Sequence, residues 1–188
     1  MPLIVRAPMK PASVGATTTV RAELVDLFRT LVDLAGLDAS AIQADVQGMS
    51  LAPLFDAPLA PPPELAAKPA FSQIGSCACK VYTKGTWSGQ ECNVGRCFQT
   101  NVSSPSWDFM GYSMLTADGW RYTVWVPMDH ATSRVDWTRP TFDELYNQTQ
   151  DKGESFDFAE YSNNVAPQFP AKVNEYRAFM QAAVESWY

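Results

Sequence analysis

The stretch 110-MGYSMLTADGWRYTVWV-126 alternates apolar and polar residues on either side of Ala117-Asp118-Gly119. Such alternation predicts two β-strands, because successive side chains of a strand point to opposite faces of the sheet. A three-residue connection that ends in glycine suits a hairpin turn. The residues that share an apolar or mixed face are Tyr112, Met114 and Thr116 on the first strand and Tyr122, Val124 and Val126 on the second. A hairpin of this kind needs a covering partner to be stable.

The end of the chain offers that partner. Residues 171–187 carry apolar side chains at helical spacing, namely Val173, Tyr176, Phe179, Met180 and Val184. This spacing predicts a helix with one apolar face. We expect the helix to pack on the apolar side of the hairpin.

The beginning of the chain has a different pattern. Leu3-Ile4-Val5 predicts a short buried strand that ends before Pro8. Thr17 to Thr19 can cap a helix that ends at Gly36. The apolar residues that recur at helical spacing in it are Val20, Leu24, Leu27, Phe28, Leu31 and Leu34. Strand, loop and helix in this order predict an α/β architecture.

The chain divides into two parts by composition. Residues 37–69 are loop-like and include Pro61-Pro62-Pro63, which we expect to be a stiff surface connector. Ala70-Phe71-Ser72-Gln73 predicts another short strand. We therefore predict that 1–69 ends an α/β domain. In our prediction 70–188 is a C-terminal subdomain with a cysteine-rich loop at 74–109 and the terminal helix.

Length and composition exclude several classes of protein. A chain of 188 residues with 46% apolar residues is long enough for one well-packed domain. The net charge of -6 leaves no basic face for a phosphate backbone, so nucleic acid is not an expected partner. No run of about 18 apolar residues is present, so we expect no membrane span.

The four cysteines indicate an oxidising compartment. Cys77, Cys79, Cys92 and Cys97 lie within 21 residues, and sequons for N-glycosylation begin at Asn101 and Asn147. This pattern favours disulfides and secretion. A disulfide between Cys77 and Cys79 would be cramped, which favours pairing of each with Cys92 or Cys97. Four thiolates binding zinc are the alternative, but a one-residue gap between ligands fits zinc poorly. The N-terminus shows no secretory leader, so we expect the chain to be the C-terminal part of a longer protein.

Several segments, in order, resemble type I sulfatases in the section that follows their active-site segments. The earlier segments are Met-Pro-Leu-Ile-Val at 1–5, Val25 to Leu31 continuing to Leu34-Ala35-Gly36-Leu37, and Gly48 to Leu54. The later ones are Ala70 to Gln73, Met110 to Ser113, Arg121 to Val126 and Glu144-Leu145-Tyr146. These later segments are most similar to the iduronate-2-sulfatase group of that family. Arg29 stands where the family usually has proline, Leu115 where it often has arginine, and Asp151 to Glu154 where it has an Asp-Pro-x-Glu turn.

The resemblance implies an alkaline-phosphatase-like α/β fold. This chain would supply an edge strand and a helix to the large domain, then a small antiparallel sheet with a C-terminal helix. It also implies hydrolysis of sulfate esters on an anionic carbohydrate by a formylglycine beside a calcium ion. A cation and basic donors must stabilise the charge that develops on the leaving oxygen. In the family these elements precede the segment that Met1 begins, so we predict no catalytic residue and no metal ligand here.

Two short motifs in the chain are similar to catalytic motifs of the family. Cys92-Asn93-Val94-Gly95-Arg96 has the cysteine and arginine of the family's nucleophile motif but valine in place of proline, and a half-cystine is the favoured interpretation. Asp129-His130 is similar to the family's metal-binding pair but lies after the hairpin. A lone Asp-His pair is more often a hydrogen bond within a loop, so we interpret it as structural.

The cysteine-rich loop carries three cations, Lys80, Lys84 and Arg96. In the resembled fold this loop lies towards the active-site mouth, so these cations are candidates to bind a sulfated or carboxylated sugar. An ordinary solvated loop is the favoured alternative. Trp87 and Trp107 are candidates to stack on sugar rings, or equally to pack within the loop.

The expected partners are the N-terminal catalytic part of the same protein, or a companion chain, and a sulfated carbohydrate. We expect the protein to be secreted, extracellular or lysosomal. A second hypothesis is a non-catalytic, disulfide-stapled extracellular module of a larger assembly. A third is a two-chain enzyme in which this is the smaller chain.

Overall fold

A computed structural model describes residues 3–38, 40, 42–76, 82–83, 86–87, 109–129, 132–140, 142–149 and 164–187. The chain forms two compact units, each described separately below. The first comprises Met1–Ala70 with Leu115–Asp118, and the second comprises Phe71–Met114 with Gly119–Tyr188. The architecture mixes helices with a small antiparallel sheet.

The hairpin predicted from the sequence is the centre of the second unit. It consists of β4 (Phe109–Leu115) and β5 (Trp120–Asp129), which are neighbours in the sheet. Gly119 ends the turn with a φ of 83°, a left-handed conformation that glycine adopts without strain. Tyr112, Tyr122 and Val124 are completely buried, as the alternation predicted. The strand ends at Leu115, so Thr116 lies in the turn and not on the strand's face.

Three further strands extend this sheet. β1 (Ala70–Ser76) lies beside β4, and it is longer than the strand predicted from the sequence. β7 (Phe142–Asn147) and the short β6 (Arg134–Val135) each pair antiparallel with β5. A separate two-stranded ribbon joins β2 (Tyr82–Thr83) to β3 (Thr86–Trp87).

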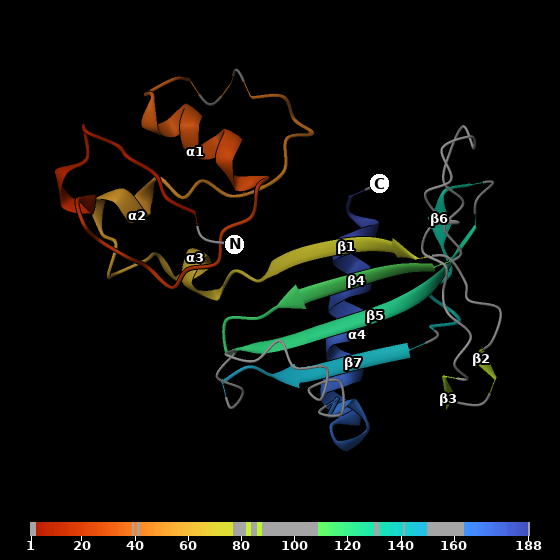
Figure 1. Cartoon of the computed structure of the whole chain (residues 1–188). Coiled ribbons are helices and arrows are strands. Elements are labelled where there is room, and N and C mark those ends of the chain that lie inside the picture. Colours follow the sequence, from red (N-terminus) through yellow and green to blue (C-terminus); the bar gives the residue numbers. More distant parts are fainter. Residues whose placement is uncertain are drawn as a thin grey trace. The chain divides into compact units, whose positions relative to one another are not determined.

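Helix α4 (Pro170–Glu185) covers one face of the sheet, as Figure 1 shows. It begins with proline, which suits the first helical position because no amide donor is needed there. The short η5 turn (Ala166–Gln168) precedes it, and Asn164 fixes this turn to β7 by accepting hydrogen bonds from the amides of Leu145 and Ala166. The C-terminal helix predicted at 171–187 is therefore confirmed.

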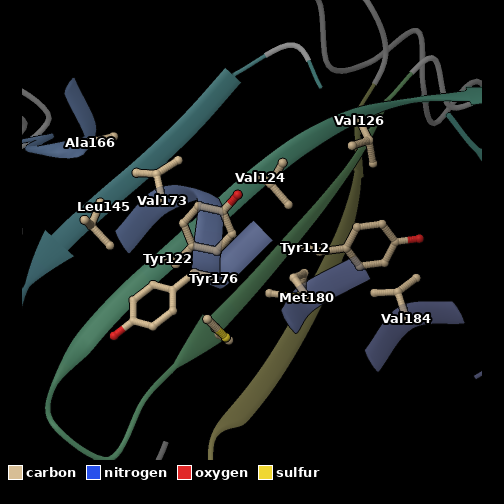
Figure 2. Close-up of a cluster of buried hydrophobic side chains, with 11 residues drawn as sticks. Tyr112, Tyr122, Val124, Val126, Leu145, Ala166, Val173, Tyr176, Met180 and Val184 are labelled. Atoms are coloured by element: carbon tan, nitrogen blue, oxygen red, sulfur yellow. The ribbon is translucent and has the colours of Figure 1, made fainter. Parts of the chain in front are cut away.

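The core of the second unit lies between α4 and the sheet (Figure 2). Its buried members are Tyr112, Met114, Tyr122, Val124, Val126, Leu145, Ala166, Val173, Tyr176, Met180 and Val184. Phe179 was predicted on the same helical face but is 50% exposed. It lies at the edge of the apolar stripe and stacks on Phe71, with ring centroids 6.2 Å apart.

The first unit consists of short helices joined by irregular segments. They are η1 (Pro11–Ser13), α1 (Asp26–Leu34), α2 (Pro53–Asp56) and α3 (Pro63–Ala67). Its apolar core is small and consists of Leu51, Leu54 and Leu65, with Val20 and Met49 packed against them. The segment 37–69 was predicted to be loop. It contains α2 and α3, both of which begin at a proline.

Two predictions for the first unit are wrong. Leu3-Ile4-Val5 forms no strand, and Ile4 is 91% exposed. A buried strand needs neighbouring strands to bind its amides and carbonyls, and the described part of 3–69 contains none. The helix predicted from Thr17 begins only at Asp26, because the β-branched run Thr17 to Val20 disfavours helix. Its predicted end is confirmed by Gly36, whose φ is 65°.

Candidate functional site

The most unusual surface of the described chain is the outer face of α1 and the turn before it. We define this outer face by Leu24, Val25, Phe28 and Leu31. Leu24 is 71% exposed, Phe28 is 53% exposed and Leu31 is 62% exposed. Leu24, Phe28 and Leu31 belong to the apolar residues that the sequence analysis found at helical spacing. Eleven of the fifteen exposed large apolar side chains belong to the first unit, so the exposure is a property of this unit as a whole.

The fully buried side chains of α1 are polar, and Leu27 and Leu34 are half-buried. Asp26 is completely buried, and Thr30 is nearly so. The Asp26 carboxylate accepts hydrogen bonds of 2.8 Å from the amides of Glu23 and Met49. Lys68 Nζ lies 3.0 Å from Asp26 Oδ2 and also pairs with the Glu23 carboxylate. A buried charge is tolerated only when it is paired and hydrogen-bonded, and both conditions are met here.

The same polar groups join two of the segments that carry the sulfatase resemblance. Thr30 Oγ1 donates to the carbonyl of Asp26 and accepts a 2.9 Å hydrogen bond from the amide of Leu51. Gly48 has a φ of 91°, and a Cβ at this position would lie 2.4 Å from the carbonyl oxygen of Val25. Only glycine fits so close to the backbone. The residues Val25 to Leu31 and Gly48 to Leu54 therefore form one hydrogen-bonded structure.

Arg29 replaces the proline usual in the resembled family. Its guanidinium donates to the carbonyl of Val46, with Nη2 at 2.6 Å and Nε at 3.2 Å. The arginine thus fixes the loop that follows α1. Leu115, at the second departure from the family pattern, ends β4 and is half-buried. Asp151 to Glu154 lie outside the described residues.

Most predicted site residues fall outside the part of the chain that the structure describes. These are Lys80, Lys84, Arg96, Cys77, Cys79, Cys92, Cys97, Asn101, Trp107 and His130. Trp87 is described only through its place in β3. The substrate-binding, disulfide and zinc hypotheses therefore stay predictions.

Two of the singled-out residues are described. Asp129 ends β5 and accepts a 2.9 Å hydrogen bond from Thr132 Oγ1. Asn147 ends β7, and its Oδ1 accepts hydrogen bonds from the amide and the hydroxyl of Thr149 at 3.1 and 2.6 Å. Both Gln148 and Thr149 are exposed.

A polar cluster that was not predicted lies between α4 and the sheet. Asp143, on β7, accepts a 2.6 Å hydrogen bond from Tyr122 OH and forms an ion pair with Arg177 of α4. Burial, followed by the hydrogen bond to Asp143, raises the pKa of Tyr122. The sequence held one signal for the cluster: Asp143 alternates with Leu145 and so lies on the core side of the strand, where a carboxylate needs a cation.

The face of the sheet opposite α4 carries a second set of side-chain contacts, between β5 and β7. Glu144 accepts 2.9 Å hydrogen bonds from Trp125 Nε1 and from Tyr146 OH. The Arg121 guanidinium lies over the Tyr146 ring, 4.9 Å from its centroid. The indole of Trp125 lies against Gly111, where a Cβ would approach within 2.7 Å of the ring. These contacts orient the side chains of β5 and β7 on this face.

The described residues contain no group of three or more His, Cys, Asp or Glu that could hold a metal ion. None of the helices in the described ranges is long and apolar enough to cross a membrane.

Comparisons with known proteins give one weak structural similarity and no family. No protein-family model matches the chain, and no curated protein is significantly similar to it. Among solved structures, the chain is similar to a sulfatase described with the metabolism of multiple glycosaminoglycans by Bacteroides thetaiotaomicron. The sequence identity is 20% and the TM-score is 0.33, with 76% of this chain and 24% of that chain covered. This chain therefore spans about a quarter of the length of that one, and a similarity at this level carries no weight for function.

Proposed function

We propose that this chain is the C-terminal part of a type I sulfatase that hydrolyses sulfate esters on an anionic carbohydrate, most similar to the iduronate-2-sulfatase group. In this proposal the chain is structural, and a catalytic part carries the formylglycine and the calcium ion. That part belongs to the same protein or to a companion chain. The basis is the ordered set of sequence segments that resemble the family.

The observation that carries the proposal is the reversed polarity of α1. Its buried side holds Asp26 and Thr30, whereas Phe28 and Leu31 face outward. The side chain of a residue such as leucine or phenylalanine gains about 1.5–3 kcal/mol when it is fully buried. An amphipathic helix with its apolar side exposed is therefore half of an interface. The catalytic α/β domain is the proposed occupant of the other half.

The N-terminal segment fits the same role. Leu3, Ile4 and Val5 are exposed and form no strand within the described chain. An apolar, β-branched segment has strand propensity but needs a sheet edge for its backbone hydrogen bonds. In the proposal, the catalytic part covers Leu3 to Val5 and the outer face of α1.

The remaining expectations belong to the same proposal. The cysteine-rich loop would be held by disulfides between Cys77 or Cys79 and Cys92 or Cys97, in a secreted or lysosomal protein. Lys80, Lys84 and Arg96 would then contribute positive charge at the substrate entrance, since a sulfated sugar is anionic.

The deciding experiment is the sequence of the complete coding region and of any chain that copurifies with this one. The proposal expects a Cys/Ser-x-Pro-x-Arg motif and an Asp-Asp pair there. A coding region and a copurifying chain that both lack these residues would contradict it.

A second experiment addresses the outer face of α1 in the complete enzyme. Phe28→Asp and Leu31→Asp should each lower the yield of folded, aryl-sulfate-cleaving enzyme about tenfold or more, because a carboxylate would be buried without a partner. Leu59→Asp is the matched control, since Leu59 is 87% exposed and lies outside α1. Equal activity of all three variants would show that α1 is not an interface.

One observation favours the alternative of a non-catalytic secreted module. The second unit has a core of its own, in which α4 covers the sheet without help from another chain. Denaturing electrophoresis of native material separates the possibilities. A catalytic chain travelling with this one indicates a two-chain enzyme, whereas a single species without sulfatase motifs indicates the module.

A further inference from the structure

The sequon at Asn147 lies where β7 ends and the chain turns. Gln148 donates its amide to the carbonyl of Gly119 at 2.9 Å, which holds the turn against the end of the hairpin. The methyl group of Thr149 lies over Gly119, where a Cβ would approach within 2.5 Å of it. Because Gly119 has no side chain, the methyl group of Thr149 can pack directly against its backbone.

The oxygen and the nitrogen of the Asn147 side-chain amide differ in their hydrogen bonds. Its Oδ1 accepts hydrogen bonds from both the amide and the hydroxyl of Thr149. Its Nδ2 donates no hydrogen bond within the described residues. The nitrogen is the atom to which an N-linked glycan is attached, so a glycan there would break no contact of the described fold.

The surroundings of Asn147 suit a sugar. Trp120 is the cross-strand partner of Asn147 in the β5–β7 register, so their side chains share one face of the sheet. The Trp120 ring contacts Phe169, with centroids 5.4 Å apart, and Phe169 is 41% exposed. The first sugar of a glycan on Asn147 would therefore begin beside this aromatic pair and Lys172, whose Nζ lies 5.0 Å from the centroid of the Trp120 ring and can donate a hydrogen bond to a sugar hydroxyl.

We propose that Asn147 is N-glycosylated, independently of the sulfatase proposal. The donor is an oligosaccharide linked to a polyprenyl diphosphate. Asn147 Nδ2 attacks the anomeric carbon, a C–N bond forms, and the bond from that carbon to the diphosphate oxygen breaks. The polyprenyl diphosphate leaves, and a proton of Nδ2 passes to a base of the transferring enzyme.

The test uses the full 188-residue chain, directed into the secretory pathway of an animal cell by an added leader. Enzymatic release of N-glycans in H₂¹⁸O converts each glycosylated asparagine to ¹⁸O-labelled aspartate. Arg121 and Arg134 separate the tryptic peptide of Asn147 from that of Asn101, so mass spectrometry reads each site alone. Secreted and cell-retained protein are both analysed, because oligosaccharide transfer does not depend on secretion.

More than half of the Asn147 peptide should carry the label in the natural chain and in Thr149→Ser, which keeps a hydroxyl. Thr149→Val should carry none, because it has the same shape without the hydroxyl. Asn147→Asp keeps the oxygen acceptor of the turn and should comigrate with natural protein that has been deglycosylated at this site. Unlabelled Asn147 predominating in both fractions, or equal labelling of Thr149→Val, would overturn the proposal.

Discussion

The two units of this chain use the same kind of sequence pattern in opposite ways. In the second unit, the apolar stripe of α4 and the apolar faces of β4 and β5 are buried against each other. In the first unit, Phe28 and Leu31 of α1 are exposed, whereas Asp26, Thr30 and Lys68 are buried beside a small apolar core. Apolar periodicity shows that a face is made for burial, but it does not show that the same chain provides the cover.

The largest expected effect concerns the buried charges of the first unit. Lys68→Ala leaves the Asp26 carboxylate buried beside Glu23 without a cation, which should cost about 3–5 kcal/mol. Hydrogen–deuterium exchange of the α1 amides measures the loss within this unit. Lys10→Ala is the control, because the Lys10–Asp56 pair is exposed and is worth about 1 kcal/mol or less. Equal effects of the two variants would mean that the buried network does not hold the first unit together.

The next effect compares one leucine from each unit. Leu145→Ala removes a completely buried side chain of the second unit and should lower the free energy of unfolding by about 2–5 kcal/mol. Leu31→Ala, on the outer face of α1, should change it by about 0.5 kcal/mol or less in the isolated chain. Urea unfolding followed by tryptophan fluorescence and by circular dichroism reports both values. A large loss for Leu31→Ala would show that α1 is already covered.

A smaller effect is expected on the face of the sheet opposite α4. Gly111→Ala places a methyl group against the Trp125 ring and should cost about 1–3 kcal/mol through displacement of the indole. The displaced ring would also lose its hydrogen bond to Glu144, which near-ultraviolet circular dichroism detects. Ser113→Ala, on the same strand and face, is the control. An unchanged tryptophan signal in Gly111→Ala would argue against this packing.

The smallest effect is a dependence on pH in the second unit. Because the pKa of Tyr122 is raised in the folded chain, its contribution to stability is complete below the ordinary value of 10.0 and is lost as the pH rises above it. The loss should be about 1.4 kcal/mol per pH unit. Tyr122→Phe removes this contribution, so the stability difference between the natural chain and the variant should shrink between about pH 10 and pH 11. A difference that stays constant over this range would contradict the assignment.

Sequence reasoning succeeded where local pattern and tertiary structure agree. The hairpin at 110–126, the turn at Gly119 and the C-terminal helix each followed from alternation, turn chemistry or helical spacing. It failed at Leu3 to Val5, because a strand needs neighbouring strands for its hydrogen bonds, and at the start of α1, because the β-branched run Thr17 to Val20 disfavours helix. The Asp143–Arg177 pair was also missed, since the two residues meet only when α4 crosses the sheet.

The sequence alone determined where strands, turns and the terminal helix form, because these depend on interactions between residues a few positions apart. It also carried the family resemblance, which is a property of ordered segments. Only the tertiary structure decided which apolar faces are covered, that α1 turns its polar side inward, and that Asn147 keeps its amide nitrogen unengaged within the described chain. The physical reason is that burial and hydrogen-bond satisfaction depend on which distant segments meet.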